Sequence, residues 1–225
     1  MPRKDKTPKF PDSYLGERAK EYDNEKWMER NQKKTTERVI EYLYDSKLGK
    51  EEVSLPSETL ILDLGCGSGF SSEFLINYDF HVIGIDILTD MISLARKRKK
   101  EALPRSKDLE LILADITKLP IRSRSIDHII SISAYNFITH DSKSEREIFS
   151  IVNTTAQYIN EILKRNGRFI IEFYPESEKM LEIFKKSFIK AGFDGFSIKE
   201  KEEQKSGKTF LLLKKSTHKK IDLID

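Results

Sequence analysis

A glycine-rich turn directly after an apolar run limits the possible folds of this chain more than any other feature. Residues 60–64 are apolar apart from Asp63, and three glycines follow at two-residue spacing: Gly65, Gly67 and Gly69. Glycine adopts backbone conformations closed to other residues, so a ligand can approach the main chain closely at such a turn. In an open α/β sheet this turn lies at the carboxyl edge of the first strand. The segment therefore predicts a buried strand that ends at a ligand site.

Apolar runs alternate with helical patterns through the rest of the chain. Residues 145–164 carry an apolar stripe with a period of about 3.6 residues, and Asn166 and Gly167 are expected to end that helix. Further strands are expected at 80–85, 109–114, 126–133, 168–174, 195–199 and 208–213. Apolar runs between helices indicate a parallel sheet covered on both faces, and the short turn before the last strand makes that strand antiparallel. The prediction is an α/β fold with a seven-stranded sheet, an antiparallel last strand and helices on both faces.

The N-terminal quarter has a different pattern from the rest. Residues 1–12 are rich in proline and lysine and are expected to form a flexible segment. A helical pattern runs from residue 14 to about residue 48, and glycine and proline punctuate the linker that follows. The expected organisation is a flexible N-terminus at 1–12, a helical lid with its linker at 13–58, the main domain at 59–214 and a charged tail at 215–225.

Composition excludes several classes of protein. Hydrophobic residues make up 38% of the chain, which is enough for a core and too many for a disordered chain. No apolar run approaches the roughly 20 residues that cross a bilayer, and the first residues lack the apolar stretch of a secretory signal. The only cysteine, Cys66, can form neither an intrachain disulfide nor a cysteine zinc site, so no metal is expected. These features are typical of a soluble intracellular protein without membrane contact.

Two acidic residues follow the second and third expected strands. Asp86 is placed to accept hydrogen bonds from both hydroxyls of a ribose, and Asp115 is placed to accept one from an exocyclic amine. Ile87 and Ile116 directly follow these acids and are expected to line the same site. A glycine turn, a diol acceptor and an amine acceptor at one sheet edge together describe a nucleoside site.

The glycine spacing separates one nucleoside class from another. The dinucleotide fingerprint is G-x-G-x-x-G, but here the third glycine comes one residue earlier, and Asp63 stands two residues before the first glycine. This spacing resembles the S-adenosylmethionine motif of class I methyltransferases, whose Rossmann-like fold has an antiparallel last strand. A dinucleotide site and a tight turn without a ligand are the alternatives. The resemblance implies S-adenosylmethionine as cofactor. Its expected binding residues are Asp63, Gly65, Cys66, Gly67, Gly69, Asp86, Ile87, Asp115, Ile116 and Ser131.

Four further segments carry a more specific resemblance. They are residues 32–38 (QKKTTER), 130–134 (ISISA), 172–176 (EFYPE) and 190–193 (KAGF). Together they resemble the eukaryotic and archaeal enzymes of the bud-site-selection family, which methylate guanine-N7 in small-subunit ribosomal RNA. The resemblance extends over residues 13–213. The family's Val-Gln-Trp run is replaced here by Tyr135, Asn136 and Phe137, so aromatic character is kept while the polar group differs.

The resemblance also implies partners and a location. The acceptor would be ribosomal RNA of the small subunit, with a role in ribosome biogenesis. A small zinc-binding activator protein would pair with the edge strand at 109–114 and form a heterodimer. The chain would act in the cytoplasm if it is archaeal-like, and in the nucleus or nucleolus if it is eukaryotic. Contacts with RNA are expected from the basic stretch at 96–107 and from the lysines near the C-terminus.

The expected reaction asks little of acid–base chemistry. Guanine-N7 has an exposed lone pair, so the enzyme mainly has to align that nitrogen with the donor methyl group. The base has to leave its stack, and aromatic faces hold such bases. Tyr135 and Tyr174 are the expected catalytic residues in this role, with Asn136 third as an acceptor for the guanine edge. Phe137 is expected to pack in the core.

Further roles are expected around this site. Glu176 is an alternative acceptor for the guanine edge, and Glu172 is expected to point into the fold or toward the N-terminal helix. Tyr14, Arg18 or Thr36 is expected to close the lid over the donor. Two other functions stay open: a small-molecule methyltransferase, and a ribosome-assembly factor whose binding matters more than its catalysis.

Overall fold

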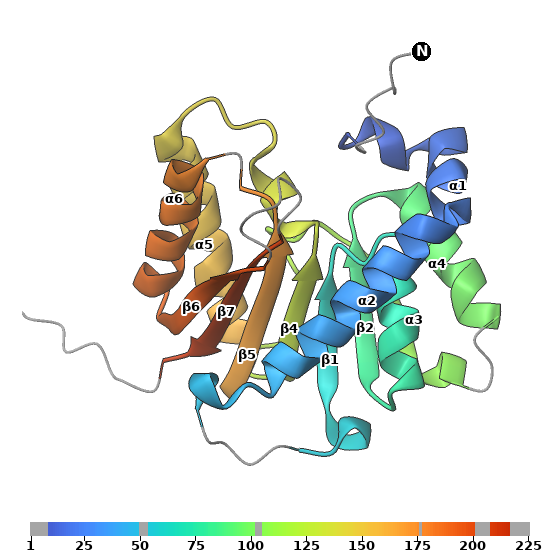
Figure 1. Cartoon of the computed structure of the whole chain (residues 1–225), viewed down its shortest axis with the longest axis horizontal. Coiled ribbons are helices and arrows are strands. Elements are labelled where there is room, and N and C mark those ends of the chain that lie inside the picture. Colours follow the sequence, from blue (N-terminus) through green and yellow to red (C-terminus); the bar gives the residue numbers. More distant parts are fainter. Residues whose placement is uncertain (1–8, 50–53, 102–104, 176, 201–207, 217–225) are drawn as a thin grey trace, which may run out of the picture.

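A seven-stranded sheet forms the centre of the computed structural model, which describes residues 9–49, 54–101, 105–175, 177–200 and 208–216 (Figure 1). The strand order is β3-β2-β1-β4-β5-β7-β6. The strands are β1 (Leu60–Leu64), β2 (His81–Asp86), β3 (Leu109–Leu113), β4 (Ile126–Ile132), β5 (Leu163–Phe173), β6 (Phe193–Lys199) and β7 (Thr209–Lys215). The first five strands are parallel to one another, whereas β7 runs antiparallel to β5 and β6. The predicted α/β fold with an antiparallel last strand is confirmed.

The fifth strand begins earlier than the sequence indicates. The helix α5 (Glu145–Ile162) ends, and the chain passes directly into β5 at Leu163. Asn166 and Gly167, expected to end that helix, therefore lie inside the strand, beside an irregularity in the pairing of β4 with β5. A side chain at Gly167 would come within 3.0 Å of the Asp127 carbonyl oxygen. Glycine here serves the close approach of two strands instead of a helix end.

Six α-helices flank the sheet in the described part of the chain: α1 (Gly16–Asn24), α2 (Lys26–Leu43), α3 (Phe70–Asn77), α4 (Thr89–Glu101), α5 and α6 (Glu178–Lys190). Short 3-10 helices connect them: η1 (Asp12–Tyr14), η2 (Ser46–Leu48), η3 (Pro56–Glu58), η4 (Arg105–Asp108) and η5 (Tyr135–Thr139). Serine caps begin α5 and α6, since the Ser144 hydroxyl accepts a hydrogen bond from Glu147 N and the Ser177 hydroxyl accepts one from Met180 N. Such caps satisfy backbone donors that the first turn leaves unpaired. No described helix is long and apolar enough to cross a membrane.

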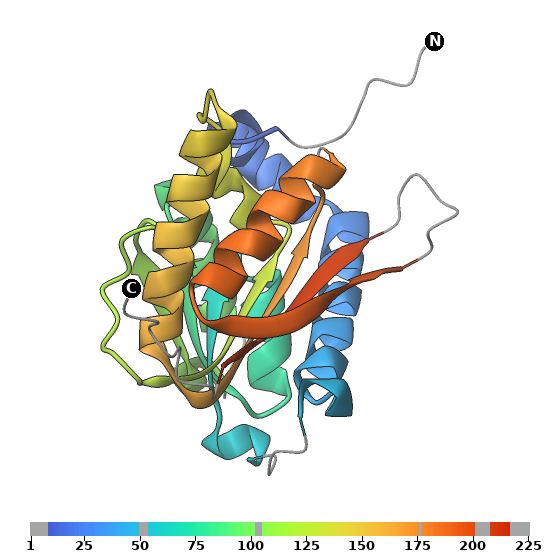
Figure 2. The same ribbon diagram turned by 90° about the vertical axis from the view of Figure 1, so that its left-hand side faces the viewer.

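Each face of the sheet has its own hydrophobic core. On one face α5 and α6 pack through side chains such as Ile159 and Phe188, with Phe169 of β5 beneath them. On the other face α2 and α3 pack through Val39 and Leu75. Figure 2 shows α5 and α6 on one side of the sheet and α2 on the other. This double covering explains why the parallel strands are apolar on both sides.

The segment expected to form the lid contains α1 and α2, and hydrogen bonds hold it near both of its ends. The Gly16 amide at the start of α1 donates a hydrogen bond to Asp90 Oδ2 of α4 (2.7 Å). The guanidinium of Arg168 in β5 donates hydrogen bonds to the carbonyl oxygens of Leu43 (2.6 Å) and Gly49 (3.0 Å) at the far end of α2. Between these points α2 crosses the face of the sheet, and its first turn lies near the carboxyl ends of the strands (Figure 1).

Candidate functional site

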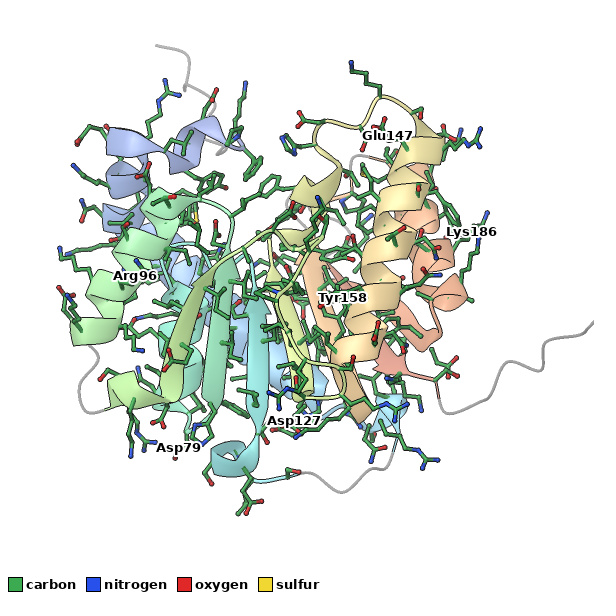
Figure 3. All side chains as sticks on the ribbon, turned by 180° about the vertical axis from the view of Figure 1, so that it is seen from behind. Asp79, Arg96, Asp127, Glu147, Tyr158 and Lys186 are labelled. Atoms are coloured by element: carbon green, nitrogen blue, oxygen red, sulfur yellow. The ribbon has the colours of Figure 1, made fainter. Side chains whose placement is uncertain are left out.

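A cavity of about 1100 Å³ opens where the carboxyl ends of the parallel strands meet the lid. Its lining comes from the turn after β1, from the loops after β2, β3, β4 and β5, from the lid and from α5. Figure 3 places Asp79 and Asp127 at the opposite end of the sheet, where β2 and β4 begin. The carboxyl edge is the ligand side of open α/β sheets, so the cavity lies where the sequence predicts a site.

The glycine turn is held against β2 by main-chain hydrogen bonds. The amides of Gly65 and Cys66 both donate to the Ile85 carbonyl oxygen, at 2.8 and 2.9 Å. Gly65 has φ +73°, and a Cβ there would lie 2.2 Å from Ala134 Cβ, so no other residue fits without moving the segment after β4. Gly67 has φ +56° and lines the cavity, and a Cβ there would meet only the Met91 sulfur at 4.0 Å. The turn thus leaves an open cradle of backbone facing the cavity.

Three of the expected cofactor residues support this turn from behind instead of lining the cavity. Asp63 is 1% exposed, and its Oδ2 accepts hydrogen bonds from the hydroxyls of Ser71 and Ser72, both at 2.6 Å. Burial raises the pKa of Asp63 to about 6, and the two serine hydrogen bonds oppose this. The Ser131 hydroxyl donates to the Leu64 carbonyl oxygen (2.8 Å), and Gly69 packs on α4. None of these three residues therefore lines the cavity in which a cofactor would bind.

Two carboxylates do line the cavity as expected. Asp86 accepts one backbone hydrogen bond on each oxygen, from Gly67 N (3.0 Å) and from Leu88 N (2.9 Å). Burial raises its pKa above the ordinary value, and these backbone hydrogen bonds oppose the shift. Asp115 Oδ1 accepts a hydrogen bond from Thr117 N (2.8 Å). A carboxylate offers about four lone-pair positions, so both groups keep capacity for donors from a ligand.

The remaining expected donor residues also line the cavity. Ile87 and Ile116 follow the two acids, and Ile87 is 50% exposed. Cys66 is buried, and burial raises the pKa of its thiol well above the ordinary value. A thiol that resists ionisation is a poor nucleophile, so Cys66 serves as a small lining residue.

The segment after β4 corrects the choice of aromatic residues. Tyr135 is fully buried, and its ring packs among Phe169, Phe184 and Phe188. It does not line the cavity, so the expectation that it holds a base is wrong. Phe137, expected in the core, lines the cavity instead. The physical reason is that residues 135–139 form a 3-10 helix with about three residues per turn.

That three-residue period sorts the segment into two faces. Tyr135 and Ile138 face the core formed with α5 and α6. Phe137 and His140 both contact Phe10: the Phe10 and Phe137 rings stack with centroids 4.8 Å apart, and the His140 ring meets Phe10 edge-on at 4.8 Å. Phe10 belongs to the stretch expected to be flexible. No local sequence pattern indicates that it joins this aromatic cluster.

Asn136 and Tyr174 lie in the cavity as expected. The Asn136 Oδ1 atom is buried and accepts no hydrogen bond from any described residue. The Tyr174 ring is 46% exposed, while its hydroxyl donates to Glu172 Oε1 at 2.9 Å. Glu172 is fully buried and pairs with Lys208 Nζ (3.4 Å), which in turn contacts Thr35 of α2. The expectation that Glu172 points toward the N-terminal helix is confirmed.

Of the three residues expected to close the lid, Tyr14 lines the cavity and Arg18 and Thr36 do not. Tyr14 lines the cavity, and burial raises its pKa to about 12. Thr36 is fully buried with its hydroxyl donating to the Gln32 carbonyl oxygen, and Arg18 is exposed outside the lining. Trp27 lines the cavity without having been singled out. Glu176 lies outside the described residues.

The basic stretch on α4 is not wholly a nucleic-acid surface, because Arg98 points inward. Its Nη2 donates to Asp23 Oδ1 of α1 (2.7 Å), and its Nε donates to the Ser68 carbonyl oxygen in the glycine turn (3.1 Å). Its Nη1 lies 3.4 Å from Glu73 Oε2 of α3, and its guanidinium covers the Phe70 ring at 4.3 Å. Arg98 therefore connects the lid to the glycine turn, and the expected RNA contact is wrong for this residue.

One of the C-terminal lysines, Lys215, is corrected in the same way. Lys215 Nζ donates to the carbonyl oxygens of Asn160 (2.6 Å) and Leu163 (3.0 Å) at the end of α5. A cation there satisfies carbonyl groups that the last helical turn leaves unpaired. Lys219 and Lys220 lie outside the described residues. No described group of His, Cys, Asp or Glu side chains is arranged to hold a metal ion.

Comparison with known proteins agrees with this architecture. The sequence profile of a methyltransferase domain family matches residues 55–205. The chain is 31% identical over 171 residues to the 18S rRNA (guanine-N(7))-methyltransferase bud23 of Schizosaccharomyces pombe, covering 75% of this chain and 61% of that protein. It is 30% identical over 200 residues to the 18S rRNA (guanine-N(7))-methyltransferase RID2 of Arabidopsis thaliana, covering 87% and 63%. The chain thus spans less than two thirds of the length of these relatives.

A solved structure supports the fold. The magnesium protoporphyrin IX methyltransferase of Synechocystis, crystallised with bound SAM, superposes with a TM-score of 0.58 at 20% identity. The match covers 82% of this chain and 79% of that enzyme. Because the family profile extends from before β1 to beyond β6 and the sheet order agrees with such a fold, the chain belongs to the methyltransferase domain family.

Proposed function

We propose that this chain transfers a methyl group from S-adenosylmethionine to guanine-N7 in ribosomal RNA of the small subunit. One observation carries the proposal: a single cavity joins a nucleoside-type half to an aromatic half that holds an unpartnered amide oxygen at Asn136. The names of the relatives support this acceptor, since both are 18S rRNA guanine-N7 methyltransferases. Such a substrate would place the chain where small subunits assemble, in the nucleolus of a eukaryote or the cytoplasm of an archaeon.

The donor half fits an adenosyl group through the chemistry of its residues. Asp86 would accept hydrogen bonds from the ribose hydroxyls, and Asp115 would accept one from the adenine amine, because each carboxylate retains acceptor capacity. Ile87 and Ile116 offer apolar contacts for the purine faces. The open backbone at Gly67 leaves room for the methionine part.

The acceptor half fits a base that arrives out of its stack. The rings of Phe137 and Tyr174 line this half and offer faces for stacking. Asn136 lines this half, and a rotation of its side chain would bring the buried, unpaired Oδ1 atom to the N–H groups of the guanine edge. Phe10 already stacks on Phe137, which shows that the Phe137 ring can hold a second flat ring.

The chemistry requires positioning more than proton transfer. S-adenosylmethionine supplies an activated methyl group on a sulfonium and departs as a neutral thioether. Guanine-N7 contributes its own electron pair, so no residue has to remove a proton first. His140 is the only histidine among the described lining residues, and its Nδ1 donates to the Phe137 carbonyl oxygen (2.8 Å) while its Nε2 lies 3.1 Å from Asp141 Oδ2. With these contacts inside its own turn, His140 holds Phe137 in place and is not poised as a base.

Methyl transfer to defined acceptors tests the proposal. The chain, purified together with any partner that remains bound to it, is incubated with radiolabelled S-adenosylmethionine and either small-subunit ribosomal RNA or a panel of catechols, quinols and small amines. We expect label in the RNA alone, and none with Asp86→Lys, which places a cation at the ribose position. Label only in a small acceptor would instead support a small-molecule methyltransferase. Normal ribosome maturation in cells that carry Asp86→Lys would favour a role in assembly over catalysis.

We also propose a small zinc-binding activator protein as partner at the β3 edge. β3 is an edge strand, and its Leu113 is 49% exposed, so apolar surface and unpaired backbone groups are available for strand addition. Any zinc would belong to the partner. Co-expression tests this proposal: a lone chain that is fully soluble, monomeric and binds the methyl donor tightly would remove its basis.

A further inference from the structure

The exposed face of α2 carries three cations at four-residue spacing, Lys26, Arg30 and Lys34. Residues four apart lie above one another on a helix, so the row extends over about 12 Å along the axis. The other two cations of this helix, Lys33 and Arg38, both form ion pairs with carboxylates. None of the three exposed cations has an ion pair with another described residue. The row therefore presents unneutralised positive charge to solvent.

An exposed tryptophan adjoins this row at the mouth of the cavity. Trp27 is 44% exposed and lines the cavity. Asn31, one turn later, lines the cavity as well. Figure 1 shows the start of α2 at the end of the sheet where the cavity opens. Tyr174, which is 46% exposed, lines the same cavity from the end of β5. Aromatic surface left in water at a cavity mouth is uncovered contact area for a ligand.

Cations beside exposed aromatic rings match one class of ligand best. Single-stranded nucleic acids bind through phosphates on basic side chains and through bases stacked on aromatic faces. An acidic protein segment would use the cations but has no need of Trp27. Arg38 continues the four-residue spacing but is paired with Glu41 and Glu200, so the unpaired positive charge ends at Lys34. The positive charge is thus concentrated next to the place where the acceptor base would enter.

The basic stretch on α4 lacks this arrangement. Arg96, Lys97 and Lys100 are exposed as well, and Figure 3 shows Arg96 on α4. No described residue of this stretch lines the cavity, and Arg98 is engaged inward with the lid. Neither triplet lines the cavity itself, but the α2 triplet alternates along its helix with the lining residues Trp27 and Asn31, whereas no residue of the α4 triplet has a lining residue beside it in the chain.

We infer that α2 is a track for single-stranded RNA, with phosphates on Lys26, Arg30 and Lys34 and a base that neighbours the target stacked on Trp27. This inference rests on the proposed function, because it takes RNA as the acceptor. It gives the lid a second role beyond covering the donor.

Intrinsic fluorescence tests the stacking contact directly, because Trp27 is the only tryptophan of the chain. The full chain is titrated with a short single-stranded RNA, with the same RNA annealed to its complement, and with polyglutamate. We expect saturable quenching by the single strand and little by the duplex or the polyacid. Trp27→Phe should bind the single strand within about threefold of the wild type by anisotropy, and Trp27→Ala about tenfold more weakly.

Matched triple variants test the phosphate contacts. Lys26→Gln, Arg30→Gln and Lys34→Gln together should lower the slope of log affinity against log salt by about 2, since a single strand contributes about 0.7 per phosphate contact. The control variant carries Arg96→Gln, Lys97→Gln and Lys100→Gln on α4 and should change the slope by less than half as much. Circular dichroism confirms that both variants are folded.

The outcomes separate this inference from the proposed function. Methylation of small-subunit RNA with no quenching, or with the α4 variant losing more affinity than the α2 variant, overturns the track and leaves the function standing. Quenching by polyglutamate equal to that by RNA also overturns it, in favour of an acidic protein. Quenching by RNA without any methyl transfer keeps the track and removes the proposed reaction.

Discussion

The two halves of the cavity are built from different material. The donor half is mostly backbone and short side chains: the glycine turn hydrogen-bonds to Ile85, and Asp86 is fixed by two amide groups. The acceptor half is made of aromatic rings from segments far apart in the sequence, Phe10, Phe137 and Tyr174. Backbone contacts admit almost no change, whereas stacked rings can be exchanged for one another. We therefore expect substitutions to be far more costly in the donor half.

The largest effect is expected at the glycine turn. Gly65→Ala adds a Cβ only 2.2 Å from Ala134 Cβ at a φ of +73°, so the turn has to move away from the segment after β4. A displacement of this kind should weaken donor binding at least about 100-fold, as measured by calorimetry with S-adenosylmethionine. Gly16→Ala is the matched control, because Gly16 also has a positive φ (+55°) but no atom within 4 Å of its Cβ position. Equal loss in both variants would show that positive φ, and not close approach, sets the requirement.

The support beneath the turn predicts a pH dependence of stability. Burial raises the pKa of Asp63 from 3.8 to about 6 in the folded chain. The resulting stabilisation is fully present below pH 3.8 and is lost as the pH rises through 6, which amounts to about 3 kcal/mol. Asp63→Asn keeps an oxygen for Ser71 and Ser72 but cannot ionise. Urea unfolding should show the wild type losing about 2 kcal/mol relative to this variant between pH 4 and 7; parallel curves would contradict the burial argument.

The acceptor half is tested by comparing variants of Phe137, which lines the cavity, and Tyr135, which is buried. Phe137→Ala removes a stacking face, so kcat/KM for RNA should fall about tenfold while donor affinity stays unchanged. Tyr135→Phe removes a buried hydroxyl without a partner, so methyl transfer should stay within about twofold and stability should not fall. A larger loss of kcat/KM in Tyr135→Phe than in Phe137→Ala would indicate that Tyr135 contacts the base, and would contradict the role of Phe137.

The smallest effect is expected where the N-terminal helices meet the donor half. Arg98 connects α1 and the glycine turn through its planar guanidinium, and we treat it as a positioning residue. Arg98→Lys keeps the charge but loses the second contact, so KM for the donor should rise about fivefold with kcat nearly unchanged. A fall in kcat alone, or a loss of RNA affinity instead, would contradict a role in holding the lid over the donor.

The same contrast explains how much the sequence predicts. β1, the glycine turn, Asp86 and Asp115 follow from local spacing, because strands and their carboxyl-edge loops are set by neighbouring residues. The sequence predicts Tyr135 in the site and Phe137 in the core, whereas the structure shows the reverse, because residues 135–139 form a 3-10 helix that turns every three residues. Spacing alone does not reveal where a strand gives way to such a turn.

Long-range contacts account for the other errors. Arg98 was grouped with its basic neighbours, but its partners come from α1, α3 and the glycine turn. Phe10 lies in a stretch rich in proline and lysine, and only the folded chain brings it onto Phe137. Charge runs and local composition show which side chains a segment contains, whereas tertiary packing decides which of them face the site and which face the interior.

The most direct measurement is to identify the methylated nucleoside. Small-subunit ribosomal RNA is incubated with the chain and S-adenosylmethionine carrying a deuterated methyl group, digested to nucleosides and analysed by mass spectrometry. The account predicts the label in 7-methylguanosine and its disappearance with Asp86→Lys. Label in another nucleoside, or none although the donor binds, would contradict it.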